Sequence, residues 1–194
     1  YYSNSDTEVL FQELIRYKID CLESLKGMWS FVLWDEDKEE IIASRDRFGI
    51  KPLYYFQSSK GDLCFCSEIN PILNLYPESK APNIKTIKQY ISRGWIDHSE
   101  ETFFLNIKQI PPASFLKISK NKNFLKNFWD LPKPNDNFID FDIIKKKFIE
   151  SISEGINSDV PIATTLSGGI DSGSINCTLA KELNLGSKIR AFSV

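Results

Sequence analysis

The chain has 194 residues, of which 42% are hydrophobic and 26% are charged, so it can fold as one domain, or one and a part, around a buried core. Its 24 Lys+Arg and 26 Asp+Glu leave a formal net charge of -2. This balance provides no basic surface for a nucleic acid or an anionic membrane, and no apolar run reaches the roughly 18 residues that span a bilayer. We therefore expect neither a nucleic-acid partner nor a membrane association.

The chain begins with Tyr1 and its only methionine is Met28, so we expect it to be processed or to be an excerpt of a longer protein. Its cysteines are scattered rather than paired for a disulfide framework, which favours a reducing, cytoplasmic compartment. The two in Cys64-Phe65-Cys66 fall on one face of a predicted strand. All four are expected to be buried or half-buried free thiols: Cys21, Cys64, Cys66 and Cys177.

The first predicted element is a helix over residues 6–20. Ser5-Asp6-Thr7-Glu8 has the form of a capping box, in which Ser5 caps the helix and Glu8 reaches back to it. The pattern then becomes typical of strands, in short apolar runs separated by turn residues. Because several runs are apolar on both faces, we expect a sheet that is covered on both sides. The four predicted strands are residues 28–34, 40–45, 53–57 and 63–67.

Further along, the patterns predict helices over 71–75 and 84–92 and extended segments over 103–107 and 114–118. Glu68 is placed to cap or anchor the first of these helices. Residues 131–140 contain Pro132, Pro134 and several Asn and Asp residues, which is typical of a linker. An amphipathic helix over 141–156 follows, then a strand over 162–166, a helix over 172–183 and a strand over 189–194. This βαβ order predicts that the last two strands are parallel neighbours.

The strongest chemical signal is Ser167-Gly168-Gly169-Ile170-Asp171-Ser172, between the strand and the helix. Paired glycines let the backbone approach a phosphate closely, and the following helix directs its positive N-terminal dipole at the anion. Asp171 would repel a bare anion, which indicates that Mg²⁺ accompanies the phosphate. No Lys-Ser or Lys-Thr follows the glycines, so the loop is not a Walker A motif. The pattern favours release of pyrophosphate over γ-phosphoryl transfer.

This loop resembles the pyrophosphate loop of ATP-pyrophosphatase enzymes. With Ser158-Asp159-Val160-Pro161 before it and Ala191-Phe192-Ser193-Val194 after it, the region resembles glutamine-hydrolysing asparagine synthetases. Four earlier segments are similar to the glutaminase domain of that family, and only the asparagine synthetase type joins the two kinds of motif in this order. The four segments are Gly27 to Phe31, Arg45 to Tyr55, Cys66 to Ile69 and Ile110 to Pro112.

The resemblance implies a fold and a division of the chain. The fold class is α/β: a partial N-terminal-nucleophile glutaminase α/β/β/α sandwich over residues 1–130, lacking its N-terminal part, and then the start of a parallel-sheet ATP-pyrophosphatase domain over 141–194, truncated. The family's nucleophile is an N-terminal cysteine, whereas position 1 is tyrosine. No catalytic residue of that kind is therefore expected in this chain, which on its own would not hydrolyse glutamine by that route.

The resemblance also implies site residues. Asp6 matches the aspartate that helps to hold the α-amino group of glutamine. Leu166 and Val194 match residues that frame the adenine of ATP, while Asp171 also matches the Mg²⁺ site. Arg45-Asp46-Arg47 is interpreted as an ion-paired structural turn, and His98 as an exposed residue. The residues that match the pyrophosphate site are Ser167, Gly168, Gly169, Asp171 and Ser172.

The implied activity is ATP-dependent amidation of aspartate with ammonia from glutamine, through β-aspartyl-AMP, with Mg²⁺ as cofactor. The implied partners are ATP, aspartate and glutamine, and the family is compatible with a homodimer. One alternative is a family member that closes an amide or lactam in natural-product synthesis and carries a vestigial glutaminase domain. The other is a non-catalytic nucleotide-binding module.

Overall fold

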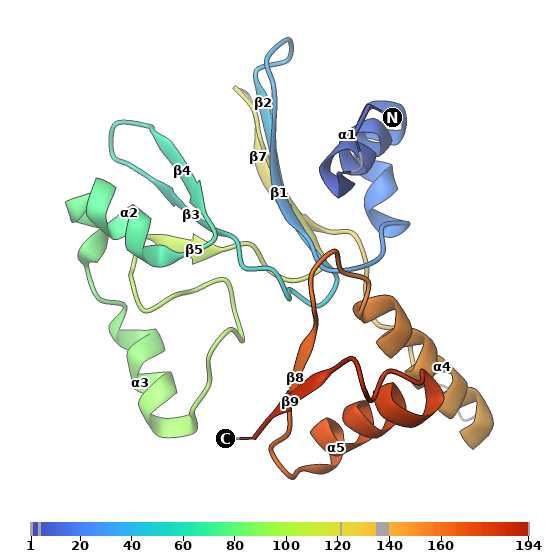
Figure 1. The fold of residues 1–194 in the computed structure, drawn as a ribbon. Helices are drawn as coiled ribbons and strands as arrows, with labels where there is room; N and C mark the ends of the chain where they lie inside the picture. The colour runs from blue at the N-terminus through green and yellow to red at the C-terminus, as the bar shows by residue number, and fades with distance from the viewer. Residues whose placement is uncertain (1, 4, 121, 135–139, 194) are drawn as a thin grey trace. The chain divides into compact units, whose positions relative to one another are not determined.

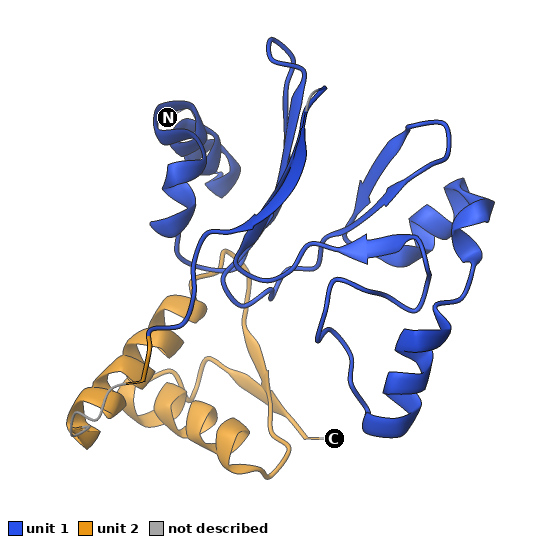
Figure 2. Ribbon diagram, turned by 180° about the vertical axis from the view of Figure 1, so that it is seen from behind, with its two compact units in different colours: residues 1–132 blue, residues 133–194 orange. Residues whose placement is uncertain are grey.

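A computed structural model describes residues 2–3, 5–120, 122–134 and 140–193 of the chain. It divides into two compact units, Tyr1–Pro132 and Lys133–Val194 (Figure 2). The predicted linker over 131–140 includes residues 135–139, which lie outside the described residues. In the described part of the chain, no helix has the length and apolar content that crossing a bilayer requires.

The first unit contains two antiparallel sheets. One is four-stranded in the order β1-β2-β6-β7, and the other is three-stranded in the order β4-β3-β5. Figure 1 shows α1 on one side of the four-stranded sheet and the three-stranded sheet on its other side, with α2 beyond. The unit therefore has the predicted α/β/β/α layers. The strands are β1 (Ser30–Asp35), β2 (Glu40–Arg45), β3 (Tyr54–Gln57), β4 (Leu63–Cys66), β5 (Ile107–Gln109), β6 (Ser114–Ile118) and β7 (Asn123–Asn127).

Two apolar clusters hold these layers together. Between the sheets, buried Ala43 of β2 and Leu116 of β6 pack with Tyr55 and Phe65 of the other sheet. On the opposite face of the three-stranded sheet, Phe56 and Ile107 pack against α2. The three-stranded sheet is therefore covered on both faces, as its sequence predicts. The helical segments of this unit are α1 (Asp6–Tyr17), the 3₁₀ segment η1 (Lys18–Glu23), α2 (Ile69–Leu75), the 3₁₀ segment η2 (Pro77–Lys80) and α3 (Ile84–Arg93).

Several predicted bounds are wrong. The first helix ends at Tyr17 rather than at residue 20, because Lys18 adopts a φ of 54° and a 3₁₀ segment follows. The strand predicted over 103–107 lies later, at Ile107–Gln109, where it pairs with β3. β7 was not predicted, because its sequence Asn-Phe-Leu-Lys-Asn is short and largely polar. It forms because β6 offers a free edge for pairing.

The second unit consists of α4 (Phe141–Gly155), β8 (Ala163–Thr165), α5 (Ile170–Cys177), the π-helical segment η3 (Thr178–Glu182) and β9 (Arg190–Phe192). β8 and β9 are parallel neighbours, as predicted, with Thr164 opposite Ala191. The predicted helix over 172–183 begins earlier, at Ile170, and its last turns are π-helical. α4 lies beside η3, where Lys145 Nζ and Glu182 Oε1 are 3.0 Å apart. These elements place the loop 166–169 where a parallel strand ends and a helix begins.

Candidate nucleotide-binding site

The candidate site is the turn between β8 and α5. Gly168 has a φ of +79°, a conformation that glycine adopts at little cost. The two serines close the turn, because their Oγ atoms are 3.0 Å apart and the Ser167 N–H donates to Ser172 Oγ at 3.2 Å. Ser167, Gly168 and Gly169 are all exposed. The structure therefore brings Ser167 and both glycines into one exposed loop, against which the half-buried Ser172 of α5 packs.

The first turn of α5 presents unpaired backbone donors. The first hydrogen bond of the helix joins the Gly173 N–H to Gly169 O at 3.0 Å. The N–H groups of residues 170–172 have no partner among the described residues, as expected at a helix N-terminus. Together with the helix dipole, these groups suit an oxyanion such as phosphate.

Asp171 lies in this first turn and its side chain is exposed. The described residues contain no group of three or more His, Cys, Asp or Glu side chains that could hold a metal ion by themselves. A single carboxylate next to a phosphate-binding turn suits Mg²⁺, which is commonly held by one or two carboxylates together with phosphate oxygens. Asp171 therefore fits a Mg²⁺ ion that arrives with a phosphate ligand.

Of the two residues predicted to frame the adenine, one can be placed. The Leu166 N–H donates to Phe192 O at 2.7 Å, which continues the parallel pairing beyond β8. The Leu166 side chain is 37% exposed, so part of its apolar surface is free for contact. Val194 lies outside the described residues.

One polar contact in this unit was not predicted. Asn176, on α5, donates through Nδ2 to Thr165 O at 3.2 Å and to Ser172 O at 2.8 Å, and its Oδ1 accepts from Thr164 Oγ1 at 2.6 Å. Twelve residues separate Thr164 from Asn176, and neither belongs to the glycine motif. No sequence signal connects them, because they meet only when β8 and α5 fold beside each other.

Asp6, the predicted glutamine-binding residue, lies in the other unit, at the first position of α1, and is exposed. Ser5 caps this helix as predicted, since its Oγ accepts from the Thr7 N–H at 3.2 Å. The second contact of the predicted capping box, in which Glu8 reaches back to Ser5, is wrong. Glu8 accepts instead from the N–H groups of Tyr2 and Ser3, both at 2.6 Å. The Ser3 hydroxyl also donates to this carboxylate and is the largest cause of its lowered pKa.

Asp46 is fully buried, and its carboxylate binds backbone N–H groups. It accepts from Phe48 and Ile50, both at 3.1 Å, from Lys51 at 3.0 Å and from Trp29 at 3.3 Å. The turn is therefore structural, as predicted. Its predicted ion pairing is wrong, because no ion pair among the described residues involves Asp46.

The neighbouring arginines also bind backbone groups. The Arg45 guanidinium donates to Lys51 O at 2.8 Å and to Ile110 O at 3.0 Å, among other acceptors. Arg47 lies over the Trp129 ring, 5.4 Å from its centroid. Backbone carbonyls can satisfy a guanidinium without a carboxylate, because each of its N–H groups needs only an acceptor. These arginines tie the turn to β5 and to the end of the unit.

The thiol predictions are confirmed for three of the four cysteines. Cys64 Sγ and Cys66 Sγ lie 3.9 Å apart on one face of β4, half-buried, and burial raises the pKa of Cys64 to about 11. Cys21 is buried, whereas Cys177 is exposed. That prediction is wrong for Cys177 because it lies on the outer face of α5.

Two other predictions concern residues near helices. Glu68 occupies the N-cap position of α2 but makes no side-chain capping hydrogen bond, so it does not cap the helix as predicted. His98 is exposed, as expected, and its Nε2 lies 3.1 Å from Gln89 Oε1.

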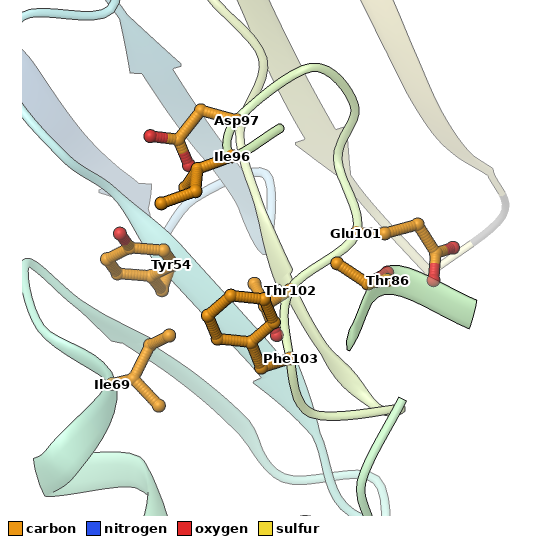
Figure 3. Close-up of a pocket in the computed structure, with 8 residues that line it drawn as sticks. All are labelled: Tyr54, Ile69, Thr86, Ile96, Asp97, Glu101, Thr102 and Phe103. Carbon is orange, nitrogen blue, oxygen red and sulfur yellow. The ribbon is translucent and has the colours of Figure 1, made fainter. Parts of the chain in front are cut away.

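A separate small cavity of about 140 Å³ lies in the first unit (Figure 3). Tyr54, from β3, and Phe103 contribute aromatic walls, and Figure 3 shows Ile69 and Ile96 on the same side as Tyr54. Two carboxylates, Asp97 and Glu101, complete the lining with Thr86 and Thr102. No sequence pattern predicts this cavity, since its lining comes from segments that are separated along the chain.

Comparison with known families agrees with both units. A family model described as a glutamine amidotransferase domain matches residues 1–129. The chain belongs to the glutamine amidotransferase domain family. The amidotransferase domain is followed by a match over residues 144–194 to the model described as asparagine synthase, the segment that carries the loop. The resemblance to glutamine-hydrolysing asparagine synthetases is thereby confirmed.

Two curated relatives and one solved structure show how this amidotransferase chain compares with individual proteins. It is 35% identical over 180 residues to asparagine synthetase [glutamine-hydrolyzing] 3 of Bacillus subtilis, covering 91% of the chain and 29% of the relative. It is 30% identical to the amidase chry2 of Gibberella zeae, covering 96% and 28%. A solved structure of glutamine phosphoribosylpyrophosphate amidotransferase from B. subtilis is similar with a TM-score of 0.43 and 16% identity, covering all of this chain and 40% of that one. The chain thus spans about 30% of the length of the two curated relatives, the asparagine synthetase and the amidase.

Proposed function

We propose that the chain is part of a ligase that amidates aspartate to asparagine at the expense of ATP, with ammonia supplied from glutamine. The observation that carries this proposal is the order of its two units. A glutamine amidotransferase domain precedes a parallel β-α unit whose glycine loop presents free N–H groups and one carboxylate. The first unit suits release of ammonia and the second suits activation of a carboxylate by ATP.

In the proposed reaction, the β-carboxylate of aspartate attacks the α-phosphorus of ATP and the bond to pyrophosphate breaks, which forms β-aspartyl-AMP. Ammonia then attacks the acyl carbon, and AMP leaves with the electron pair of the C–O bond. The N–H groups of residues 170–172 and the Ser167 hydroxyl would hold the leaving pyrophosphate, whose negative charge grows in the transition state. Asp171 would hold Mg²⁺, which supplies further neutralisation of that charge when bound.

Two other roles belong to this proposal. Asp6 would hold the α-amino group of glutamine, since an exposed carboxylate suits an ammonium group. Leu166 would contact the adenine with its exposed apolar surface, and Val194 with its backbone. The four free cysteines support a reducing, cytoplasmic setting, and we propose a homodimer as the assembly.

Pyrophosphate release tests this proposal in the full-length protein. We expect release that depends on both aspartate and ATP, and we expect Asp171→Asn to lower it by about a hundredfold, in line with the loss of a group that stabilises transition-state charge. Asp142→Asn, in the first turn of α4, makes the same charge change in the same unit and should leave release unchanged. Release that is absent, or that Asp171→Asn leaves unchanged, would refute the assignment.

A second candidate is supported by the similarity to a protein named as an amidase. In that case the enzyme would use the same adenylation but close an amide or lactam on a different carboxylate, with a vestigial glutaminase domain. Pyrophosphate release that requires a carboxylate other than aspartate would favour this candidate. The residue that follows the initiator methionine of the full reading frame decides the state of the glutaminase, because any residue except cysteine excludes glutamine hydrolysis by the family's nucleophile. Nucleotide binding without any pyrophosphate release would favour a non-catalytic module.

A further inference from the structure

The turn between β8 and α5 is held at both ends by one side chain. Asn176 lies one helical turn after Ser172, and its Nδ2 donates to Thr165 O and to Ser172 O. Thr165 is the last residue of the strand before the loop, and Ser172 is the residue that closes the loop. The two acceptors therefore flank the whole segment that would contact the pyrophosphate.

The orientation of this amide is itself determined. Thr165 O and Ser172 O can only accept, so the group that contacts both of them is the NH2 of the amide, and the amide oxygen accepts from Thr164 Oγ1 at 2.6 Å. With the oxygen fixed in this way, both hydrogens of Nδ2 are directed to the two carbonyl groups. A chain of hydrogen bonds from Thr164 through Asn176 thus reaches both ends of the loop. All four residues of the contact lie in the second unit and come from its strand and its helix.

We propose that Asn176, oriented by Thr164, is a positioning residue that keeps the glycine loop in the conformation that binds pyrophosphate. This inference rests on the proposed function of the loop. The loop contains Gly168 with a φ of +79°, and glycine is the residue that loses most conformational freedom when it is held in one conformation. Because the carbonyl groups on both sides of Gly168 are held, the loop loses less conformational freedom when the ligand binds. Asn176 does this without contacting the ligand.

The arrangement predicts a specific pattern of effects. The Thr164 hydroxyl acts only through Asn176. Removing this hydroxyl should therefore weaken binding when the Asn176 amide is present and should have no effect when the amide is absent. The effect should appear in the affinity for pyrophosphate and in the KM for ATP. The KM for aspartate should not change, because the hydrogen bonds of this network involve only the glycine loop and the residues beside it. A role limited to general stability would lower all of these properties together.

The test compares Thr164→Val, Asn176→Ala and the double variant of the full-length protein, using inorganic pyrophosphate with Mg²⁺ as the probe in calorimetry and as a product inhibitor. We expect each single variant to bind pyrophosphate about tenfold more weakly, the double variant to be no weaker than Asn176→Ala, and Thr164→Ser to restore wild-type affinity. Cys177→Ser, at the next position of α5, is the matched control and should bind normally, because Cys177 is exposed.

The outcomes separate this inference from the function on which it rests. If the wild-type protein does not bind pyrophosphate, the proposed function fails and this inference fails with it. If the wild type binds and both single variants bind equally well, the loop keeps its assignment and the positioning role is refuted. Additive losses in the double variant, or equal changes in the KM for aspartate and for ATP, would also refute it. Should Asn176→Ala fail to fold, the nearly isosteric Thr164→Val variant alone decides, by a tenfold loss or by none.

Discussion

Two turns in this molecule direct backbone N–H groups toward a negative charge, but the two turns have different roles. In the first unit, the turn after β2 directs three N–H groups at the Asp46 carboxylate, Trp29 supplies a fourth, and Asp46 is completely buried. In the second unit, the turn after β8 exposes the N–H groups of residues 170–172 without any acidic side chain bound to them. The first turn carries its own anion and is structural. The second turn leaves its N–H groups without a partner among the described residues, and in the proposed function an anion from outside the chain takes that place.

A structural turn and a binding turn can look alike in sequence, because both contain glycine and aspartate and both follow a strand. The deciding property is whether the N–H groups are already satisfied by the chain. A buried carboxylate must be hydrogen-bonded, and the N–H groups around Asp46 supply those bonds from within the chain. Exposed N–H groups can be paired by water until a ligand replaces it. The loop before α5 is exposed in this way.

The largest expected effect comes from removing the internal anion. Asp46→Ala would remove a buried carboxylate together with the hydrogen bonds that it accepts from four N–H groups, and we expect it to lower the free energy of unfolding of the first unit by about 3 kcal/mol. All four tryptophans lie before residue 133, so tryptophan fluorescence during urea denaturation reports on this unit alone. Asp37→Ala, in the exposed turn between β1 and β2, is the control and should change the stability little. Equal stability of the two variants would contradict the structural role of the buried carboxylate.

A smaller effect is expected at the glycine of the same turn. Gly49 has a φ of +63°, and a Cβ atom there would lie 2.8 Å from Pro112 Cγ and 3.0 Å from Arg45 Cζ. We expect Gly49→Ala to destabilise the first unit by about 2 kcal/mol, from backbone strain together with overpacking. Thermal unfolding, followed by the same fluorescence, measures the change. A shift no larger than that of an exposed glycine such as Gly61, which also has a positive φ but no neighbour within 4 Å, would show that packing does not matter there.

At the glycine of the binding turn, only strain should operate. Gly168 also has a positive φ, but nothing lies within 4 Å of a Cβ atom added to it. We expect Gly168→Ala to cost about 1 kcal/mol, which corresponds to roughly fivefold weaker pyrophosphate binding if the strain is taken up on binding. Titration with magnesium pyrophosphate measures this loss, and tryptophan fluorescence should show no change in the first unit. Unchanged pyrophosphate affinity would mean that the strain at this glycine is not taken up when the ligand binds.

The smallest effect concerns an exposed version of the Asp46 arrangement. Hydrogen bonds from Ser3 and Tyr2 lower the pKa of Glu8, so the contribution of this carboxylate is present above its unfolded pKa and is lost as the pH falls through the lower, folded value. We expect the start of α1 to fray slightly below about pH 4.3. Glu8→Gln should remove this pH dependence of the helical circular dichroism signal. The same dependence in the variant would assign it to another carboxylate.

The sequence predicted those parts of the fold in which local patterns decide. The bounds of β2 and β6 are as predicted, because each is a clear apolar run between turn residues. β5 and β7 were misplaced or missed, because their formation depends on edges offered by β3 and β6. The same distinction holds at the site. The glycine loop is a contiguous motif and could be located, whereas the contact of Asn176 with Thr164 depends on folding and could not.

The uneven burial of the cysteines has a practical consequence for labelling. Burial raises the pKa of Cys21 and of Cys64, so their thiolate forms are scarce at neutral pH, and Cys66 is half-buried beside Cys64. Cys177 is the exposed thiol among the four, and it lies on α5 directly after Asn176. Among the cysteines of this chain, a maleimide dye or nitroxide should therefore attach preferentially to Cys177, and its signal would report how the turn before the helix responds to nucleotide.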